Sequence, residues 1–483
     1  MLITLAAPAF AGTWYIENGD ITVKASGTEG KNTVSQGANQ EVEDTNTIIT
    51  NQKTDTASSH TVTIEAGNDK VEVTLKDVNI DTSSRNNAAV SVTGSGNTTI
   101  KLDGDNALKS DTYRSGIAST GSLTISGGEN DSLTAQGGSG TDGSGGRGIF
   151  SKDLTISGGT VNANGGDGKN GSDGGDGISS DSLTISGGTV TTKGGSGDDG
   201  GSGVLIYSNG SLTVSGGTVT ANGGNSGGIF NGGRGISSYG GVTVSGGTVN
   251  ANGGDSEDGD GGSGIFSFDR VAISGGTVEA AGGVGKNGSG GSGIYSSGID
   301  LSGSLELTAK AGSPNGKALS QNGKELDLDT INKDKLDPGA KVTATDADGK
   351  VIDQVPIPRP VEPEKPVIPE ESSSSSDGGS ATPSAPASPL PGLTVTDKSG
   401  AVISYTSTQS GNTLTVCVGR FTASLRASLA ALRQLRAEGI ETIAFQTILC
   451  STTLSVDELL AMGGEDAEAV LTHRFTDSSL TVG

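Results

Sequence analysis

The sequence predicts a mainly β protein: a parallel β-helix, or solenoid, with coils of about 29 residues. Three features predict it, namely a repeated six-residue segment, three short alternating runs per repeat and a long stretch without proline. A Pro/Ser-rich linker and a small α+β domain are expected after the solenoid. Glycine accounts for 83 of 483 residues and aromatic residues for only 3%. Short coils that turn on glycine and bury a few aliphatic side chains suit this composition.

The repeated segment has the sequence Leu-Thr-Ile-Ser-Gly-Gly at its first clear copy, which starts at Leu123. Related copies start at positions 154, 183, 212, 242 and 271, so the spacings run from 29 to 31 residues. Most copies are followed by a Thr-Val strand with two glycines, then by a polar loop and a short Gly-Ile run. Apolar and polar residues alternate in all three runs, which is the period of a β-strand.

A single coil cannot bury its apolar face alone, so the coils must stack. Stacked strands lie about 4.8 Å apart, and repeats in register place identical Val and Ile side chains above one another. Proline is absent between Gly12 and Gly312, as expected where each backbone N–H bonds to a neighbouring coil. A helical solenoid is excluded because the repeats lack a 3.6-residue period and contain too much glycine.

The ends of the solenoid differ from its middle. The β-helix is expected over 12–312, with less regular first coils, and 313–354 is expected to form a cap or exit segment. Residues 1–11 end in Ala9-Phe10-Ala11, a small-residue cleavage pattern, and are interpreted as the remnant of a signal peptide. This interpretation implies a secreted protein.

The last third of the chain changes in composition. Residues 355–392 hold ten of the thirteen prolines and a run of serines, which predicts an extended, flexible linker. Residues 393–483 are expected to form a small α+β domain, with helices over 422–438 and 456–462 between short strands. Its two cysteines, Cys417 and Cys450, are compatible with a disulfide or with two buried thiols.

The charge balance limits the classes of partner. The formal net charge is −24, so the chain should repel nucleic-acid backbones. No stretch approaches the roughly 20 apolar residues of a membrane-spanning helix. A neutral ligand, or one bridged by a cation, fits such a chain better.

Acidic residues cluster in the polar loops of successive repeats, which should emerge at one corner of the stack. Carboxylate oxygens in flexible glycine-rich loops are suited to binding Ca²⁺. The alternative is that these acidic loops only form a solvent-exposed edge of the stack. The candidate calcium ligands are Asp167, Asp173, Asp176, Asp198, Asp199, Asp255, Glu257, Asp258 and Asp260.

Aromatic residues follow an aliphatic residue in several copies of the third run. If the aliphatic residue points inward, alternation turns the aromatic ring outward, and stacking would then produce an aromatic stripe. Such a stripe is suited to sugar rings, unless the rings tuck under the adjacent loops. The candidate carbohydrate-binding residues are Phe150, Tyr207, Phe230, Phe266 and Tyr295.

Catalytic signals are weak. The two histidines, His60 and His473, fall in different predicted domains, so no Ser-His-Asp arrangement is expected in the repeats. We therefore expect no catalytic residues.

The runs 12–23, 73–80 and 99–106, together with the repeated Leu-Thr-Ile-Ser-Gly-Gly-Thr-Val, resemble surface proteins of gut Firmicutes. Those proteins carry β-helix domains similar to the cellulose- and pectin-binding, pectate-lyase-like family of clostridia. The resemblance covers roughly residues 12–312. It implies a right-handed β-helix that binds polysaccharide with bound calcium, but no family ligand position matches this chain residue by residue.

Three functions remain as hypotheses from the sequence. The first is a secreted, non-catalytic module that binds plant or mucosal polysaccharide at a bacterial surface. The second is a structural or adhesive repeat protein whose C-terminal domain binds a protein partner. The third is a polysaccharide lyase or hydrolase; a pectate lyase fits worse because the family's Arg-x-Pro context is missing here.

Overall fold

The computed structural model confirms the predicted fold class, a β-solenoid of about twelve turns of roughly 29 residues followed by a small domain with two sheets. It describes residues 12–28, 30–140, 142–356, 393–397, 401–403, 405–410, 412–418, 422–447, 451–462, 468–473 and 478–482. The expected signal-peptide remnant and nearly all of the expected linker lie outside these ranges. The chain divides into two compact units between Pro366 and Val367.

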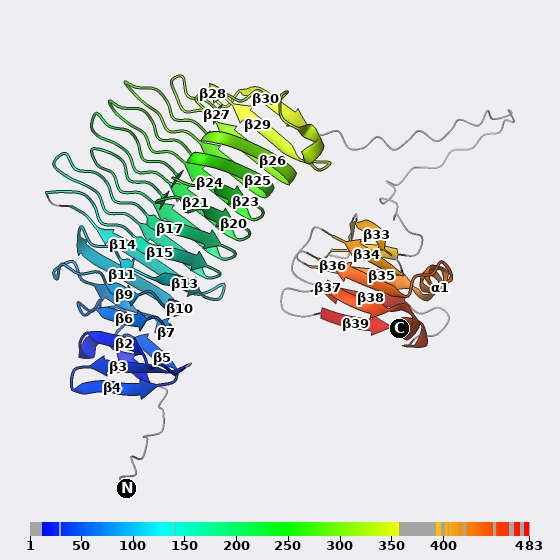
Figure 1. The fold of residues 1–483 in the computed structure, drawn as a ribbon, viewed down its shortest axis with the longest axis horizontal. Helices are drawn as coiled ribbons and strands as arrows, with labels where there is room; N and C mark the ends of the chain where they lie inside the picture. The colour runs from blue at the N-terminus through cyan, green and yellow to red at the C-terminus, as the bar shows by residue number, and fades with distance from the viewer. Residues whose placement is uncertain are drawn as a thin grey trace, which may run out of the picture. The chain divides into compact units, whose positions relative to one another are not determined.

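Each coil of the solenoid contributes to three ladders of parallel strands (Figure 1). Ladder I contains β2 (Ile21–Ala25), β6 (Val62–Gly67), β9 (Val90–Gly94), β12 (Ile117–Ser119), the first parts of β15 (Ile149–Ile156), β17 (Ile178–Ile185), β25 (Ile265–Ala281) and β26 (Ile294–Lys310), and β19 (Val204–Ile206), β22 (Ile236–Ser238) and β27 (Leu319–Gln321).

Ladder II holds the Leu-Thr-Ile-Ser runs. It contains β1 (Thr13–Tyr15), β5 (Thr47–Thr50), β7 (Lys70–Lys76), β10 (Asn97–Asp103), β13 (Ser122–Ser126), β20 (Leu212–Val214), β23 (Val242–Val244) and parts of β15, β17, β25 and β26.

Ladder III holds the Thr-Val runs. It contains β8 (Asn79–Asp81), β11 (Asp105–Thr112), β14 (Ser132–Gly138), β16 (Thr160–Asn164), β18 (Thr189–Lys193), β21 (Thr218–Asn222), β24 (Thr248–Asn252), the ends of β25 and β26, and β29 (Lys341–Thr345).

The register stacks like side chains on like. In ladder I, Ile149 pairs with Ile178, which pairs with Val204, and these side chains are fully buried. Burial of each aliphatic side chain contributes about 1.5–3 kcal/mol. A left-handed glycine turns the chain between ladders II and III in the repeats that start at positions 154, 183, 212, 242 and 271, as at Gly188, where φ is 78°. Glycine adopts this left-handed conformation without the penalty that a Cβ brings.

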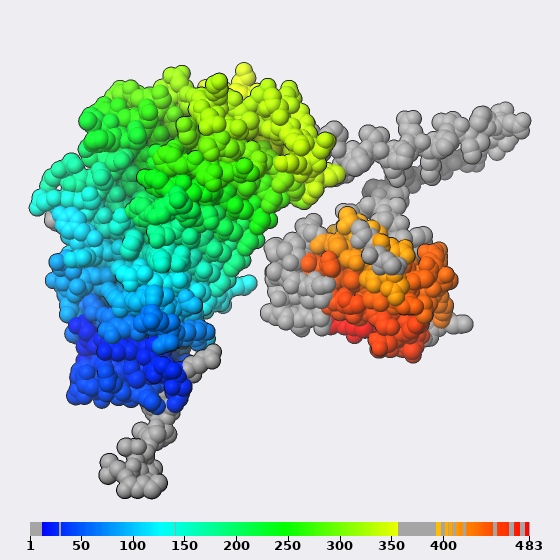
Figure 2. All heavy atoms as spheres, viewed as in Figure 1, coloured from blue at the N-terminus to red at the C-terminus, as the bar shows by residue number. Residues whose placement is uncertain are grey.

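Antiparallel strands close both ends of the stack. At the N-terminal end, β3 (Asn32–Gln36) and β4 (Asn39–Asp44) cover the first coil beside the 3₁₀ turn η1 (Ile16–Asn18). At the other end lie β28 (Lys324–Glu325), the 3₁₀ turn η2 (Lys333–Lys335) and β30 (Val351–Pro356). The capped solenoid forms one continuous body from its blue to its yellow-green coils (Figure 2).

The small domain has two sheets. One contains β31 (Leu393–Thr396), β32 (Val402–Ile403), β35 (Ala423–Ser428), β38 (Glu468–His473) and β39 (Ser478–Val482). The other contains β33 (Thr406–Ser410), β34 (Thr413–Cys417), β36 (Thr442–Gln446) and β37 (Ser451–Ser455). The helices are α1 (Leu429–Ala437) and α2 (Val456–Met462).

One predicted helix boundary in this domain is wrong. The first half of the helix expected over 422–438 is the strand β35, and α1 starts only at Leu429. Residues Ala423, Leu425 and Ala427 alternate inward in β35, a period that the leucine spacing concealed. Ser428 then begins the helix, because its Oγ accepts a hydrogen bond from the N–H of Ala431 at 3.2 Å.

Candidate functional site

The polar segments between ladders III and I are stacked hairpins rather than free loops. We call residues 137–148, 165–177, 194–203, 223–235, 253–264 and 282–293 the hairpin array; they appear in Figure 1 as long cyan-to-green loops beside the coils. One chain of backbone hydrogen bonds crosses the array between glycines of alternating arms. The N–H of Gly201 donates to Gly195 O at 2.9 Å, that of Gly224 to Gly201 O at 2.8 Å, and that of Gly233 to Gly224 O at 2.8 Å.

The glycines of the array are required by close approach of the backbones. A Cβ on Gly201 would overlap the carbonyl oxygen of Gly175, and one on Gly224 would overlap that of Gly195. In the hairpin 194–203 every third residue is glycine, a spacing that matches the three residues per turn of a polyproline II helix. The high glycine content therefore allows the close packing of the hairpin array as well as the turns between strands.

Five of the candidate calcium ligands link successive hairpins of the array. Asp167 Oδ1 accepts from the N–H of Ser196 at 2.8 Å, Asp255 Oδ1 from that of Val284 at 2.7 Å, and Asp260 Oδ1 from that of Ser289 at 2.8 Å. Asp258 Oδ1 accepts from Asn287 Nδ2 at 2.8 Å, and Glu257 pairs with Lys286 at 2.5 Å. Each bond joins residues 29 apart, so these acids hold neighbouring coils in register.

The other candidate carboxylates belong to the hairpins that border a groove. Asp173, Asp176 and Asp199 line it, whereas Asp198 is not among its lining residues. Within the described part of the chain, no three His, Cys, Asp or Glu side chains are grouped as they would be around a metal ion.

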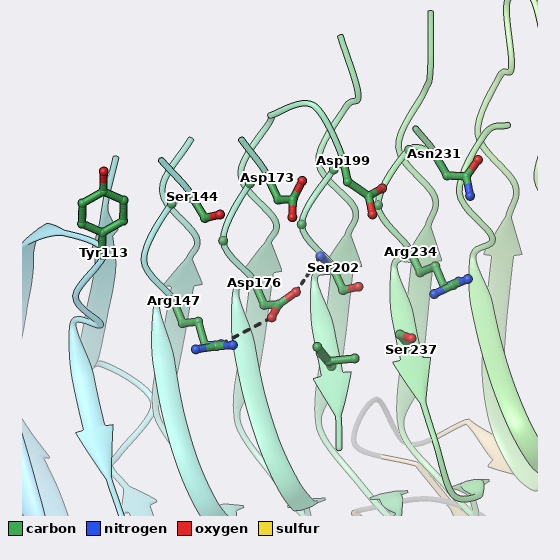
Figure 3. Close-up of a pocket in the computed structure, with 18 of the residues that line it drawn as sticks. Tyr113, Ser144, Arg147, Asp173, Asp176, Asp199, Ser202, Asn231, Arg234 and Ser237 are labelled. Atoms are coloured by element: carbon green, nitrogen blue, oxygen red, sulfur yellow. Dashed lines mark hydrogen bonds and ion pairs between the residues drawn. The ribbon is translucent and has the colours of Figure 1, made fainter. Parts of the chain in front are cut away.

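The groove has a volume of about 470 Å³ and crosses the C-terminal arms of four successive hairpins (Figure 3). Its floor includes the outward side chains of ladder I. Its lining side chains are hydroxylic, amide, charged and aromatic: Tyr113, Ser144, Arg147, Asp173, Asp176, Asp199, Ser202, Leu205, Asn231, Arg234, Ser237 and Tyr239. Stacking thus assembles the groove from residues more than a hundred positions apart.

An ionic network between half-buried side chains fixes one wall of the groove. Arg147 Nε lies 3.6 Å from Asp176 Oδ2, and its Nη2 donates to the hydroxyl of Tyr207 at 2.7 Å. Asp176 also accepts from Ser179 Oγ at 2.7 Å and from the N–H of Ser202 at 2.9 Å. Burial raises the pKa of Asp176, although these hydrogen bonds and Arg147 oppose the shift. Asp176 therefore ties two coils together.

Asp173 and Asp199 differ from Asp176, because both side chains are exposed to the groove. Neither forms an ion pair with any described residue. Desolvation by the groove walls and the nearby charge of Asp173 raise the pKa of Asp199, which Arg234 partly counteracts. Two carboxylates of adjacent coils are thus left available to a ligand.

Tyr113 lies at one end of the groove in an unusual backbone conformation. Its φ is 64°, in the left-handed region that costs a bulky residue of the order of 1–2 kcal/mol. Half of the side chain (51%) is exposed. Tyr239, at the other end, is 50% exposed. The groove therefore runs between two accessible aromatic rings.

The expected aromatic stripe is only partly present. Phe150, Phe266 and Tyr295 occupy one outward position of ladder I, where Ser179, Leu205 and Ser237 separate the first from the other two. Tyr207 follows β19 by one residue and contacts Arg147.

Phe230 does not lie in ladder I, which corrects the expected stripe. It is 50% exposed in the hairpin 223–235, beside Ile229, which is 73% exposed. The run Gly228-Ile229-Phe230 has the Gly-Ile-Phe sequence that is typical of a ladder I strand. The ladder I strand of this coil is nevertheless β22.

Phe266 cannot offer a free ring face to a sugar. The Arg234 guanidinium lies 3.9 Å from its ring centroid, and Tyr295 stacks on it with centroids 5.1 Å apart and an interplanar angle of 10°. Phe268 meets its edge at 4.8 Å and itself stacks with Tyr239 at 5.0 Å. The accessible rings of this cluster are Tyr239 and Phe268.

Sequence reasoning missed much of the groove, namely Tyr113, Arg147, Asn231, Arg234 and Tyr239, and it missed Phe268 in the adjoining aromatic cluster. Two signals were present. Phe268 follows Phe266 by two residues and so shares its face of the strand. Arg147, Asp176 and Arg234 each stand two residues before a ladder I strand, so the stack places them in one row.

The histidines and cysteines form no shared site in the described residues. His60 Nδ1 lies 3.4 Å from Asp20 at the N-terminal end of the solenoid. His473 is buried in the small domain, where Nε2 lies 2.9 Å from Thr452 Oγ1. Cys417 has a free thiol, whereas Cys450 lies outside the described residues.

No known protein family, curated protein or solved structure matches this chain. Within the part of the chain that the structure describes, neither helix has the length and apolar character needed to span a membrane.

Proposed function

We propose that the solenoid binds a polysaccharide chain in the groove and does not cleave it. One observation carries the proposal: a row of hydroxyl, amide, carboxylate and guanidinium groups crosses four coils between two exposed tyrosines. Sugar hydroxyls donate and accept hydrogen bonds, and Asp173, Asp199 and Asn231 offer the complementary groups. Tyr113 and Tyr239 offer aromatic surface to sugar rings.

The repeat geometry favours a linear polymer. Coils recur about every 4.8 Å, which is close to the length of one sugar residue in an extended chain. Successive sugars would therefore meet successive coils, and several weak contacts would add up along the groove. The strands and hairpins that hold the side chains also reduce the ordering cost of binding.

Calcium enters the proposal only as an auxiliary ligand. Ca²⁺ takes six to eight oxygen ligands, so Asp173 and Asp199 would need oxygens of the polysaccharide or of water to complete a site. The proposed location, outside the cell at a bacterial surface, rests on the sequence alone.

The strained conformation of Tyr113 supports a functional role for this end of the groove. Residues held in sparsely populated backbone regions cluster at ligand-binding sites, where the rest of the structure imposes the geometry. Here Tyr113 lies beside Gly143, where even a Cβ would approach the ring of Tyr113 within 2.9 Å.

Affinity electrophoresis of the full chain in gels containing a neutral soluble glucan tests the proposal. Tyr113→Ala and Tyr239→Ala should each weaken retention about five- to tenfold, equivalent to about 1–1.4 kcal/mol. Tyr15→Ala, which removes an exposed tyrosine from the N-terminal coil, is the matched control and should bind like wild type.

The proposal is wrong if a panel of neutral and acidic polysaccharides fails to retard the wild-type chain. It is also wrong if both groove variants bind as tightly as the Tyr15 control, because binding would then occur elsewhere. Release of shortened chains during long incubation would replace binding with catalysis as the function of the groove.

A further inference from the structure

We infer that the groove selects polysaccharides without acid groups, and that Asp173 and Asp199 determine this selectivity. The inference rests on the proposed function and identifies its class of ligand. It arises from how charges are paired in the groove, which the overall charge of −24 does not reveal.

The arginines of the groove are already engaged. Arg147 is paired with Asp176 and donates to Tyr207. The guanidinium of Arg234 lies over the Phe266 ring, 3.9 Å from its centroid. A uronate or sulfate group that entered the groove would have to share these guanidinium groups with the partners that they already have.

The free charges of the groove are negative. Asp173 and Asp199 come from adjacent hairpins and are exposed to the same space, as Figure 3 shows. Among the described residues neither carboxylate has a cation within ion-pair distance. An acidic sugar would approach two carboxylates that have no ion-pair partner, whereas a neutral sugar would donate its hydroxyl groups to them.

Two cellulose derivatives with the same backbone test the inference. Hydroxyethyl cellulose is neutral and carboxymethyl cellulose is anionic, so their difference in retention reports charge rather than backbone shape. We expect wild type to bind the neutral polymer at least tenfold more tightly at low ionic strength. Added salt should narrow this difference, because exposed charges are screened.

The double variant D173N/D199N keeps the shape and hydrogen-bonding capacity of both side chains. It should gain about five- to tenfold in binding carboxymethyl cellulose and stay within about twofold on hydroxyethyl cellulose. The control E129Q/E279Q removes the same charge from exposed positions of the solenoid outside the groove. It should leave both affinities unchanged.

The outcomes separate the two proposals. Equal binding of both polymers by wild type overturns the selectivity and leaves polysaccharide binding intact. An equal gain in the control variant overturns the role of Asp173 and Asp199, because net charge alone would explain it. If added Ca²⁺ makes wild type bind carboxymethyl cellulose but has no effect on D173N/D199N, the selectivity proposal is overturned. The two carboxylates would then bind acidic sugars through a bridging cation instead of repelling them. Failure of all variants to bind either polymer overturns both proposals.

Discussion

Replacement of Gly224 by alanine should open the hairpin array locally while leaving the three strand ladders intact. The N–H of Gly224 donates to Gly201 O, and its carbonyl accepts from the N–H of Gly233, both at 2.8 Å. A Cβ at this position would overlap the carbonyl oxygen of Gly195 and lie 2.9 Å from that of Gly194. The added methyl group faces backbone atoms, so no flexible side chain can move aside.

The magnitude follows from these contacts. Loss of two backbone hydrogen bonds costs about 2 kcal/mol, and overpacking by one methyl group adds about 1–3 kcal/mol if the arms do not separate fully. We expect the hairpin 223–235 to lose about 2–5 kcal/mol of local stability. Its amide protons should then exchange about 30 to 4,000 times faster than in wild type.

Hydrogen exchange followed by mass spectrometry measures this effect peptide by peptide. Gly227→Ala is the matched control, since the nearest atom to its added Cβ is Gly197 O at 4.0 Å and its backbone φ is not left-handed. Equal protection of 223–235 in the two variants would refute the packing argument. Faster exchange throughout the solenoid would show instead that the array and the ladders unfold together.

Two further predictions concern the stability of the solenoid. Ile185→Ala removes a fully buried side chain from ladder II and should lower the free energy of unfolding by about 2–5 kcal/mol, measured by denaturant titration. Burial alone would raise the pKa of Asp20, but Arg85 and the N–H of Thr61 lower it from 3.8 to about 2. Because the folded pKa is depressed, the stabilisation is present above pH 3.8 and lost as the pH falls towards 2. The shift corresponds to about 2.4 kcal/mol unscreened, and to about 1 kcal/mol once the 47% exposure of Asp20 is allowed for. In Asp20→Asn, exchange of the first coils should therefore change less between pH 5 and pH 2 than in wild type; equal pH dependence would contradict this.

The repeat pattern alone determined the solenoid. Residues such as Ile149, Ile178 and Ile265 recur at multiples of the 29-residue coil, and their alternation with polar residues allows only strands that stack in register. Proline-free repeats and the change in composition after residue 354 predicted the division into a solenoid and a small domain. Such inferences succeed because they depend on local periodicity, which the linear sequence contains in full.

Helix α1 shows where local pattern was insufficient. Leucines at 425, 429, 432 and 435 fit a helical face, yet Leu425 lies in β35, between β31 and β38. The neighbouring strands decided its conformation, and they come from segments more than 25 residues away on either side.

The candidate groove depended still more on tertiary structure. Sequence reasoning singled out Asp173, Asp176 and Asp199 as candidate calcium ligands, but it did not show that Asp176 has an ion-pair partner while Asp173 and Asp199 have none. It read Phe266 as a sugar platform, although Arg234 and Tyr295 cover its two faces. The repeat period predicts which residues stack on one another in successive coils. It does not predict which side chains from different positions of the repeat come into contact. Those contacts decide which charges have a partner and which aromatic rings are accessible, and only the packed structure determines them.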